Sequence, residues 1–170
     1  MKQVVIVDGY NIIGAWGELQ KLKEHSLEEA RDRLIDMLAD YKAYKGHKVY
    51  VVFDAHQVPG LGGKYRQLQI EVLYTREKET ADERIERLVA DLRGRRVQIY
   101  VATSDSVEQH VTFGQGALRL PARELLFTIR EIRKEIRSKI QETSAPAKNS
   151  VDSKLSDELR EKFEKWRRGL

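Results

Sequence analysis

The stretch Val4-Val5-Ile6-Val7-Asp8-Gly9-Tyr10-Asn11 decides the fold, because four consecutive apolar residues end directly on a carboxylate. A strand without polar alternation is buried on both faces, which is typical of the centre of a parallel sheet. Two further runs, at residues 49–53 and 97–102, are similarly apolar, and each is soon followed by an aspartate. The pattern predicts an α/β fold with a doubly wound, mainly parallel sheet flanked by helices.

Capping boxes and a proline predict where helices begin. Ser26-Leu27-Glu28-Glu29 precedes a helical stripe of apolar residues that lasts until Gly46. Thr80-Ala81-Asp82-Glu83 precedes a second such stripe, and Pro121 stands where a third helix begins. The alternation of strands and helices along the chain supports the doubly wound sheet.

The segments between these elements predict loops and the domain boundaries. Residues 55–64 are rich in glycine and predict a mobile loop, and residues 70–74 alternate like a short strand near the edge of the sheet. We predict a main domain over residues 1–141, a linker over 142–153 and a C-terminal helical extension over 154–170.

Composition limits the classes of function. The 170 residues include no Cys, which excludes disulfide-linked partners, thiolate catalysis and Cys-based zinc sites. No apolar run reaches the length of a signal peptide or a membrane span, so we expect a cytoplasmic protein without membrane contact. The net charge of +4 comes entirely from residues 130–170, which hold 12 basic and 8 acidic side chains. This excess predicts either a phosphate-binding face or a solvated helix with ion pairs.

Four aspartates form the candidate site. Asp8, Asp54 and Asp105 follow apolar runs, and Asp82 lies in the first turn of a predicted helix. The carboxyl ends of parallel strands share one edge of a sheet, so these carboxylates are expected to meet there. Converging carboxylates recruit a cation, and oxygen ligands without Cys or His nearby select Mg²⁺ or Mn²⁺. The commonest work of such a site is phosphoryl chemistry on a nucleotide or nucleic acid.

Each of these side chains also has a purely structural interpretation. Asp8 and Asn11 can form an Asx turn, Asp82 suits the helix macrodipole, and Asp105 can cap a short helix after it. Ser104 lacks the Gly-x-Ser-x-Gly surroundings of a triad nucleophile. A Walker lysine motif and Gly-x-Gly-x-x-Gly are also absent, which argues against nucleoside triphosphate hydrolysis and dinucleotide binding. Repetition of the pattern favours a site over four separate turns.

Four segments, in this order, together resemble a known family: Asp8-Gly9-Tyr10-Asn11, Phe53-Asp54-Ala55, Glu79-Thr80-Ala81-Asp82-Glu83 and Thr103-Ser104-Asp105. They look like the motifs of the NYN domain, a PIN-like nuclease fold, and in particular of its bacterial YacP-like branch. The resemblance covers about residues 1–140. It implies a metal-dependent endoribonuclease that acts on mRNA in association with translating ribosomes.

The same resemblance implies roles for individual residues. Asp8 and Asp82 would hold the catalytic Mg²⁺ or Mn²⁺, and Asp54 and Asp105 would complete or orient the site, with Asp105 among the catalytic residues. The neighbouring polar side chains would assist: Asn11 and Ser104. RNA or ribosome contacts would come from the basic C-terminal helices and from the glycine-rich loop with its flanking residues: Lys64, Tyr65 and Arg66.

Two alternatives stay open. The chain could be a non-catalytic RNA- or ribosome-binding module of the same fold. It could also be a receiver-like signalling domain that accepts phosphate on an aspartate, although no Lys lies just after a late strand and Asn11 would then have no use.

Overall fold

The computed structural model describes residues 2–55, 64–104, 116–144, 161–162 and 166–167. Six strands form one sheet in the order β3-β4-β2-β1-β5-β6. Five of them run parallel: β1 (Lys2–Asp8), β2 (Lys48–Phe53), β4 (Ile70–Tyr74), β5 (Val97–Thr103) and β6 (Leu118–Pro121). The remaining strand, β3 (Lys64–Gln67), pairs antiparallel with β4. The predicted α/β class with a mainly parallel sheet is confirmed.

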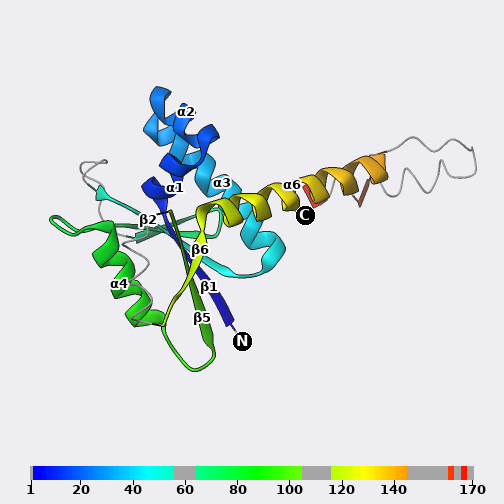
Figure 1. The fold of residues 1–170 in the computed structure, drawn as a ribbon. Helices are drawn as coiled ribbons and strands as arrows, with labels where there is room; N and C mark the ends of the chain where they lie inside the picture. The colour runs from blue at the N-terminus through cyan, green and yellow to red at the C-terminus, as the bar shows by residue number, and fades with distance from the viewer. Residues whose placement is uncertain (1, 56–63, 105–115, 145–160, 163–165, 168–170) are drawn as a thin grey trace, which may run out of the picture. The chain divides into compact units, whose positions relative to one another are not determined.

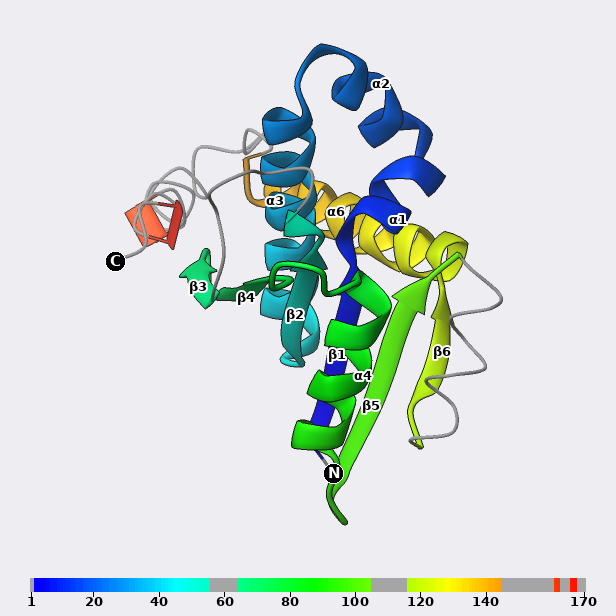
Figure 2. The ribbon, with the colours of Figure 1, turned by 90° about the vertical axis from the view of Figure 1, so that its left-hand side faces the viewer.

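Helices cover both faces of this sheet. The described helices are α1 (Gly9–Ala15), α2 (Gly17–His25), α3 (Leu27–Lys45), α4 (Ala81–Leu92) and α6 (Ala122–Ser144). Figures 1 and 2 show α4 on one face of β1 and β5, and α3 on the opposite face of the sheet. The core on the α4 side joins Val4 and Ile6 of β1 to the apolar stripe of α4: Ile85, Leu88 and Val89. Strand β1 lies between β2 and β5, and from Val4 to Asp8 it is buried throughout.

The capping residues place the two main helices where the sequence predicts them. Ser26 Oγ accepts a hydrogen bond from the backbone N–H of Glu29 at 3.2 Å, and α3 ends at Gly46, whose φ of 74° is left-handed. Thr80 Oγ1 accepts from the backbone N–H of Glu83 at 3.1 Å and starts α4. Both predicted helix starts are confirmed, and so is the third, since α6 follows Pro121.

The structure differs from the sequence predictions at both margins of the sheet. Residues 70–74 form a strand, but β3 pairs with it, so β4 is an interior strand and is buried along its whole length. Lys64–Gln67 belong to this edge strand rather than to a loop. The sequence also did not predict β6 on the opposite edge. Both edge strands have four residues, too few to show a period that distinguishes a strand from a loop.

The chain divides into two compact units, Met1–Ile129 and Arg130–Leu170, and α6 begins in the first and continues into the second. The helix extends to Ser144, slightly beyond the predicted boundary of the main domain at residue 141. Most of the predicted linker and C-terminal helix lies outside the described residues, as do the predicted loop over 56–63 and the predicted short helix after residue 105.

Candidate active site at the carboxyl edge of the sheet

Three of the four aspartates lie where polypeptide segments begin or end at the carboxyl edge of the sheet. Asp8 is the last residue of β1, and Asp54 directly follows β2, which runs parallel to β1. Strand β4 is also parallel to β2, so the connection from β4 to α4 starts at this edge. Asp82 lies in the first turn of α4, which runs back along the face of β1 and β5 (Figure 2).

Asp8 and Asp82 both lie on the α4 side of the sheet; Asp8 is buried and Asp82 is half-buried. The alternation of a strand puts Asp8 on the same face as Val4 and Ile6, which pack against α4. The Asp8 side chain is only 4% exposed, and the Oδ1 atom of Asp82 is also buried. Although Asp8 is the N-cap residue of α1, its side chain makes no capping hydrogen bond. The capping function in α4 belongs to Thr80, so neither carboxylate is needed to start its helix.

Asn11 ties the start of α1 to the end of β5. Its Oδ1 atom accepts three hydrogen bonds, from Thr103 Oγ1 at 3.1 Å, from the backbone N–H of Ser104 at 2.7 Å and from Ser104 Oγ at 2.8 Å. Thr103 is fully buried, whereas Ser104 is exposed. The structure therefore brings the two predicted polar helpers into contact, and the amide oxygen of Asn11 fixes where β5 ends, beside the position of Asp105 in the sequence.

Gly9 is the first residue of α1 and not part of a tight turn. A Cβ atom at this position would lie 2.3 Å from Cε1 of Phe53 and 3.0 Å from the carbonyl oxygen of Val52. Phe53 cannot move aside easily, because its ring is fully buried between Tyr10, at 5.1 Å between ring centroids, and Tyr74, at 5.8 Å. The glycine thus allows the helix that begins behind Asp8 to pack directly on β2.

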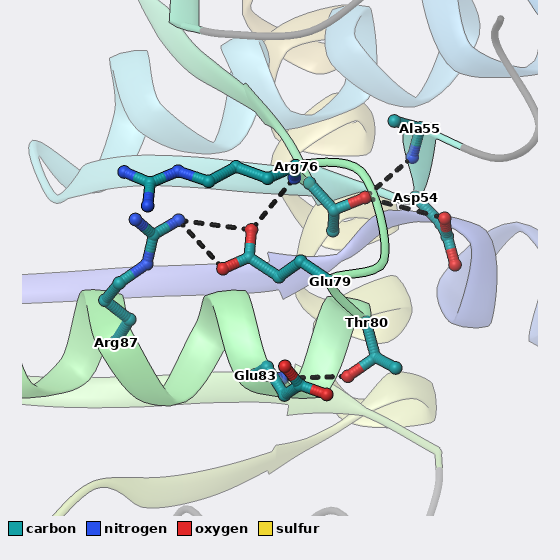
Figure 3. A network of polar contacts seen from close by, with 8 residues as sticks. Asp54, Ala55, Arg76, Glu79, Thr80, Glu83 and Arg87 are labelled. Carbon is teal, nitrogen blue, oxygen red and sulfur yellow. Dashed lines mark hydrogen bonds and ion pairs between the residues drawn. The ribbon is translucent and has the colours of Figure 1, made fainter.

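A cluster of polar contacts holds the connection that carries Asp82 (Figure 3). Glu79 Oε1 accepts a hydrogen bond from the backbone N–H of Arg76 at 3.0 Å, and the Glu79 carboxylate forms an ion pair with Arg87 at 3.0 Å. Arg87 lies two turns along α4 from its start. Burial, followed by the nearby positive charge of Arg87, lowers the pKa of Arg84 on the same helix. Glu79 thereby fixes the loop to the helix that positions Asp82.

Asp54 contacts the residue that follows β4. Its Oδ1 atom accepts from Thr75 Oγ1 at 3.5 Å, while the same threonine oxygen accepts a hydrogen bond from the backbone N–H of Ala55 at 2.8 Å. Thr75 is 1% exposed, so this hydroxyl links the ends of β2 and β4 inside the protein. This role of Thr75 could not be predicted from the sequence, because a threonine after a strand has many possible partners.

The remaining predicted site residues are not all described. Asp105 lies outside the described residues, and for Lys64, Tyr65 and Arg66 only the backbone of β3 is described. Among the described residues, no three His, Asp or Glu side chains are grouped so that they could hold a metal ion. The four-aspartate metal site therefore stays a prediction.

Three comparisons with known proteins match the same family over nearly the whole chain. The model of the YacP-like NYN domain family matches residues 5–168. The Bacillus subtilis protein YacP is 50% identical over 166 residues, which cover 98% of this chain and 97% of that protein. A crystal structure of Rae1 (YacP) from Bacillus subtilis is 50% identical, has a TM-score of 0.75 and covers 98% of this chain and 95% of that chain. A Trp→Leu variant of Rae1 (YacP) gives a TM-score of 0.78 at 46% identity, with 99% and 96% covered.

Within the described residues, none of the helices combines the length and hydropathy that a membrane span requires. The match to the family model extends over nearly the entire chain, and the relatives are matched over nearly their entire length. This chain belongs to the YacP-like NYN domain family, whose nuclease-like fold supports an RNA-related role of the nuclease type.

Proposed function

We propose that this chain is a metal-dependent endoribonuclease that cuts mRNA internally, acts in the cytoplasm and works in association with the ribosome. The observation that carries the proposal is the position of Asp8 and Asp82 at one edge and on one side of the sheet, with Asp8 buried and one carboxylate oxygen of Asp82 buried, in a YacP-like NYN domain. A carboxylate buried in this way is costly unless an opposite charge or hydrogen bonds offset it.

The donor set fits a hard divalent cation. Asp8 and Asp82 would hold Mg²⁺ or Mn²⁺ through carboxylate oxygens, with Asp54 and Asp105 completing or orienting the site. When bound, such a cation supplies a water of lowered pKa and offsets the negative charge that develops on the phosphodiester. No side chain of the protein is then required as a nucleophile.

The surrounding residues would set the position of these ligands. Gly9 lets α1 start directly behind Asp8, and Glu79 fixes the loop that leads to Asp82. Asn11 holds Ser104 in place through two hydrogen bonds. Small displacements of reacting groups reduce rates strongly, so these residues would contribute to the rate without touching the RNA.

RNA contacts are proposed at two places. Lys64, Tyr65 and Arg66 belong to the edge strand β3, and an edge strand is accessible from one side. The basic excess of residues 130–170 would bind phosphates of mRNA or ribosomal RNA.

The test is an assay with a 5′-labelled mRNA that is incubated with the purified chain, in Mg²⁺ or in EDTA, with and without translating ribosomes. We expect discrete internal cleavage products in Mg²⁺ and none in EDTA, with more product when ribosomes translate the message. Binding of RNA or ribosomes without any cleavage would favour the non-catalytic module instead.

A further inference from the structure

A hollow of about 290 Å³ lies next to the carboxyl end of β5. Its lining comes from the end of α1, from Ser104, from the end of β6 and from the first turns of α6. Ser104 is also the residue that Asn11 holds through two hydrogen bonds, and Asn11 lies one helical turn after Asp8. The hollow therefore adjoins the edge of the sheet that carries the candidate active site.

The wall of the hollow is apolar and fixed. Trp16 is 2% exposed, and its Nε1 atom donates a hydrogen bond to the backbone carbonyl of Ala122 at 2.9 Å. This bond joins the end of α1 to the start of α6. Pro121 and Leu126 add further apolar surface. Because the wall is part of the packed structure, the hollow exists before any ligand arrives.

The rim of the hollow is positively charged. Arg119 in β6 and Arg123 in the first turn of α6 are both exposed, and none of the described lining residues is acidic. A guanidinium group matches the geometry of a phosphate and can bind it through two parallel hydrogen bonds. Ser104 adds a hydroxyl, which can still accept a hydrogen bond while it donates to Asn11.

We propose that this hollow is a subsite for one nucleotide of a single-stranded RNA, next to the nucleotides whose linkage is cut. The base would pack on the apolar surface of Pro121 and Leu126, and its phosphate would bind Arg119 and Arg123. The volume lies at the low end of the range for small-ligand pockets, about 300–1,000 Å³, which suits one nucleotide and not a base-paired stem. The inference rests on the proposed nuclease function and adds where the RNA strand lies.

The chain offers a matched control at the opposite end of β5. A second hollow of about 500 Å³ is lined by Arg93 and Arg95, together with Gly94 and Val97 at the start of that strand. Replacing either pair of arginines by alanine removes the same charge from the protein. Only the pair Arg119 and Arg123 adjoins the carboxyl edge. A difference in RNA affinity between the two double variants therefore reflects binding at this hollow and not the net charge of the protein.

The experiment measures binding of a fluorescently labelled single-stranded RNA to the full chain by anisotropy, in EDTA and at several salt concentrations. For Arg119→Ala/Arg123→Ala we expect about tenfold weaker binding and a shallower salt dependence, by about 0.7 units of slope per lost phosphate contact. For Arg93→Ala/Arg95→Ala we expect at most about a twofold change, because long-range charge effects are screened by salt.

A third variant tests whether the volume of the hollow is needed for RNA binding, independently of the arginine charges. Ala15 is exposed and lines the hollow, so Ala15→Trp should fill it and weaken binding without altering any arginine. Equal losses in the two double arginine variants, or unchanged binding in both Arg119→Ala/Arg123→Ala and Ala15→Trp, would overturn the subsite. Failure of the unaltered chain to cleave RNA would instead contradict the proposed function, so the two failures are distinguishable.

Discussion

Replacing Gly9 by alanine tests how the fold supports the site. The added Cβ atom would lie 2.3 Å from Cε1 and 2.5 Å from Cδ1 of Phe53, far inside van der Waals contact. The Phe53 ring is fully buried, so either the ring or the start of α1 must shift. Forcing an extra carbon into a packed core typically costs about 1–3 kcal/mol.

Helix propensity acts in the opposite direction but is weaker. Alanine is favoured over glycine by at most about 1 kcal/mol inside a helix, and Gly9 is only the first residue of α1. The net expectation for Gly9→Ala is therefore a loss of about 1–2 kcal/mol in the free energy of unfolding. Because Gly9 adjoins Asp8, the same shift should displace this carboxylate and reduce RNA cleavage, by as much as about a hundredfold for a displacement near 1 Å.

The assay is urea unfolding of a double-mutant cycle with Phe53→Leu, which removes Cε1, the ring atom that the new Cβ would approach most closely. If the clash is the cause, Gly9→Ala should cost less in the Phe53→Leu background, with a coupling energy of about 1 kcal/mol or more. Unfolding midpoints that show Gly9→Ala to be neutral or stabilising would refute the reasoning. Strictly additive losses would show that the contact with Phe53 is not responsible.

Three further changes have defined outcomes. Asn11→Ala should lower the free energy of unfolding by about 1–3 kcal/mol, since the buried Thr103 hydroxyl loses its acceptor; adding Thr103→Val should recover part of the loss in urea unfolding, and full additivity would contradict the bond. Glu79→Ala should lower the melting temperature and the cleavage rate together, whereas Glu79→Gln keeps an oxygen acceptor for the loop and should lose less of both. Burial, then the nearby charge of Lys45, lowers the pKa of His47 below its ordinary value of 6.5. Unfolded chains then take up a proton more readily than folded ones, so stability should fall as the pH drops below about 6.5, and His47→Gln should remove this part of the pH dependence.

The sequence predicts features that depend on local chemistry. Continuous apolar runs identified three of the four interior strands, β1, β2 and β5, because a strand buried on both faces has few polar residues. Ser26 and Thr80 identified the helix starts, because a side-chain acceptor satisfies backbone donors that a helix leaves unpaired. The position of Asp8 and Asp54 at the carboxyl edge of the sheet followed from the parallel arrangement of β1 and β2.

The features that the sequence missed depend on contacts between distant segments. The need for glycine at position 9 comes from the ring of Phe53, which follows much later in the chain. Asn11 was expected to assist the site, but its bond to the end of β5, 92 positions away at Thr103, could not be predicted. Glu79 pairs with Arg87, eight positions later on a helix, and the sequence contains many other arginines that could have paired with it.

The central claim is that Asp8 and Asp82 serve catalysis and not folding, and one paired measurement tests it most directly. Asp8→Asn and Asp82→Asn are assayed for internal cleavage of a labelled mRNA in Mg²⁺, and the melting temperature of each protein without metal is recorded alongside. We predict that cleavage is lost in both variants while the melting temperature is kept or raised, because each change removes the charge of a carboxylate with a buried oxygen without altering the shape of the side chain. Undiminished cleavage in either variant, or a melting temperature that falls sharply in both, would contradict the claim.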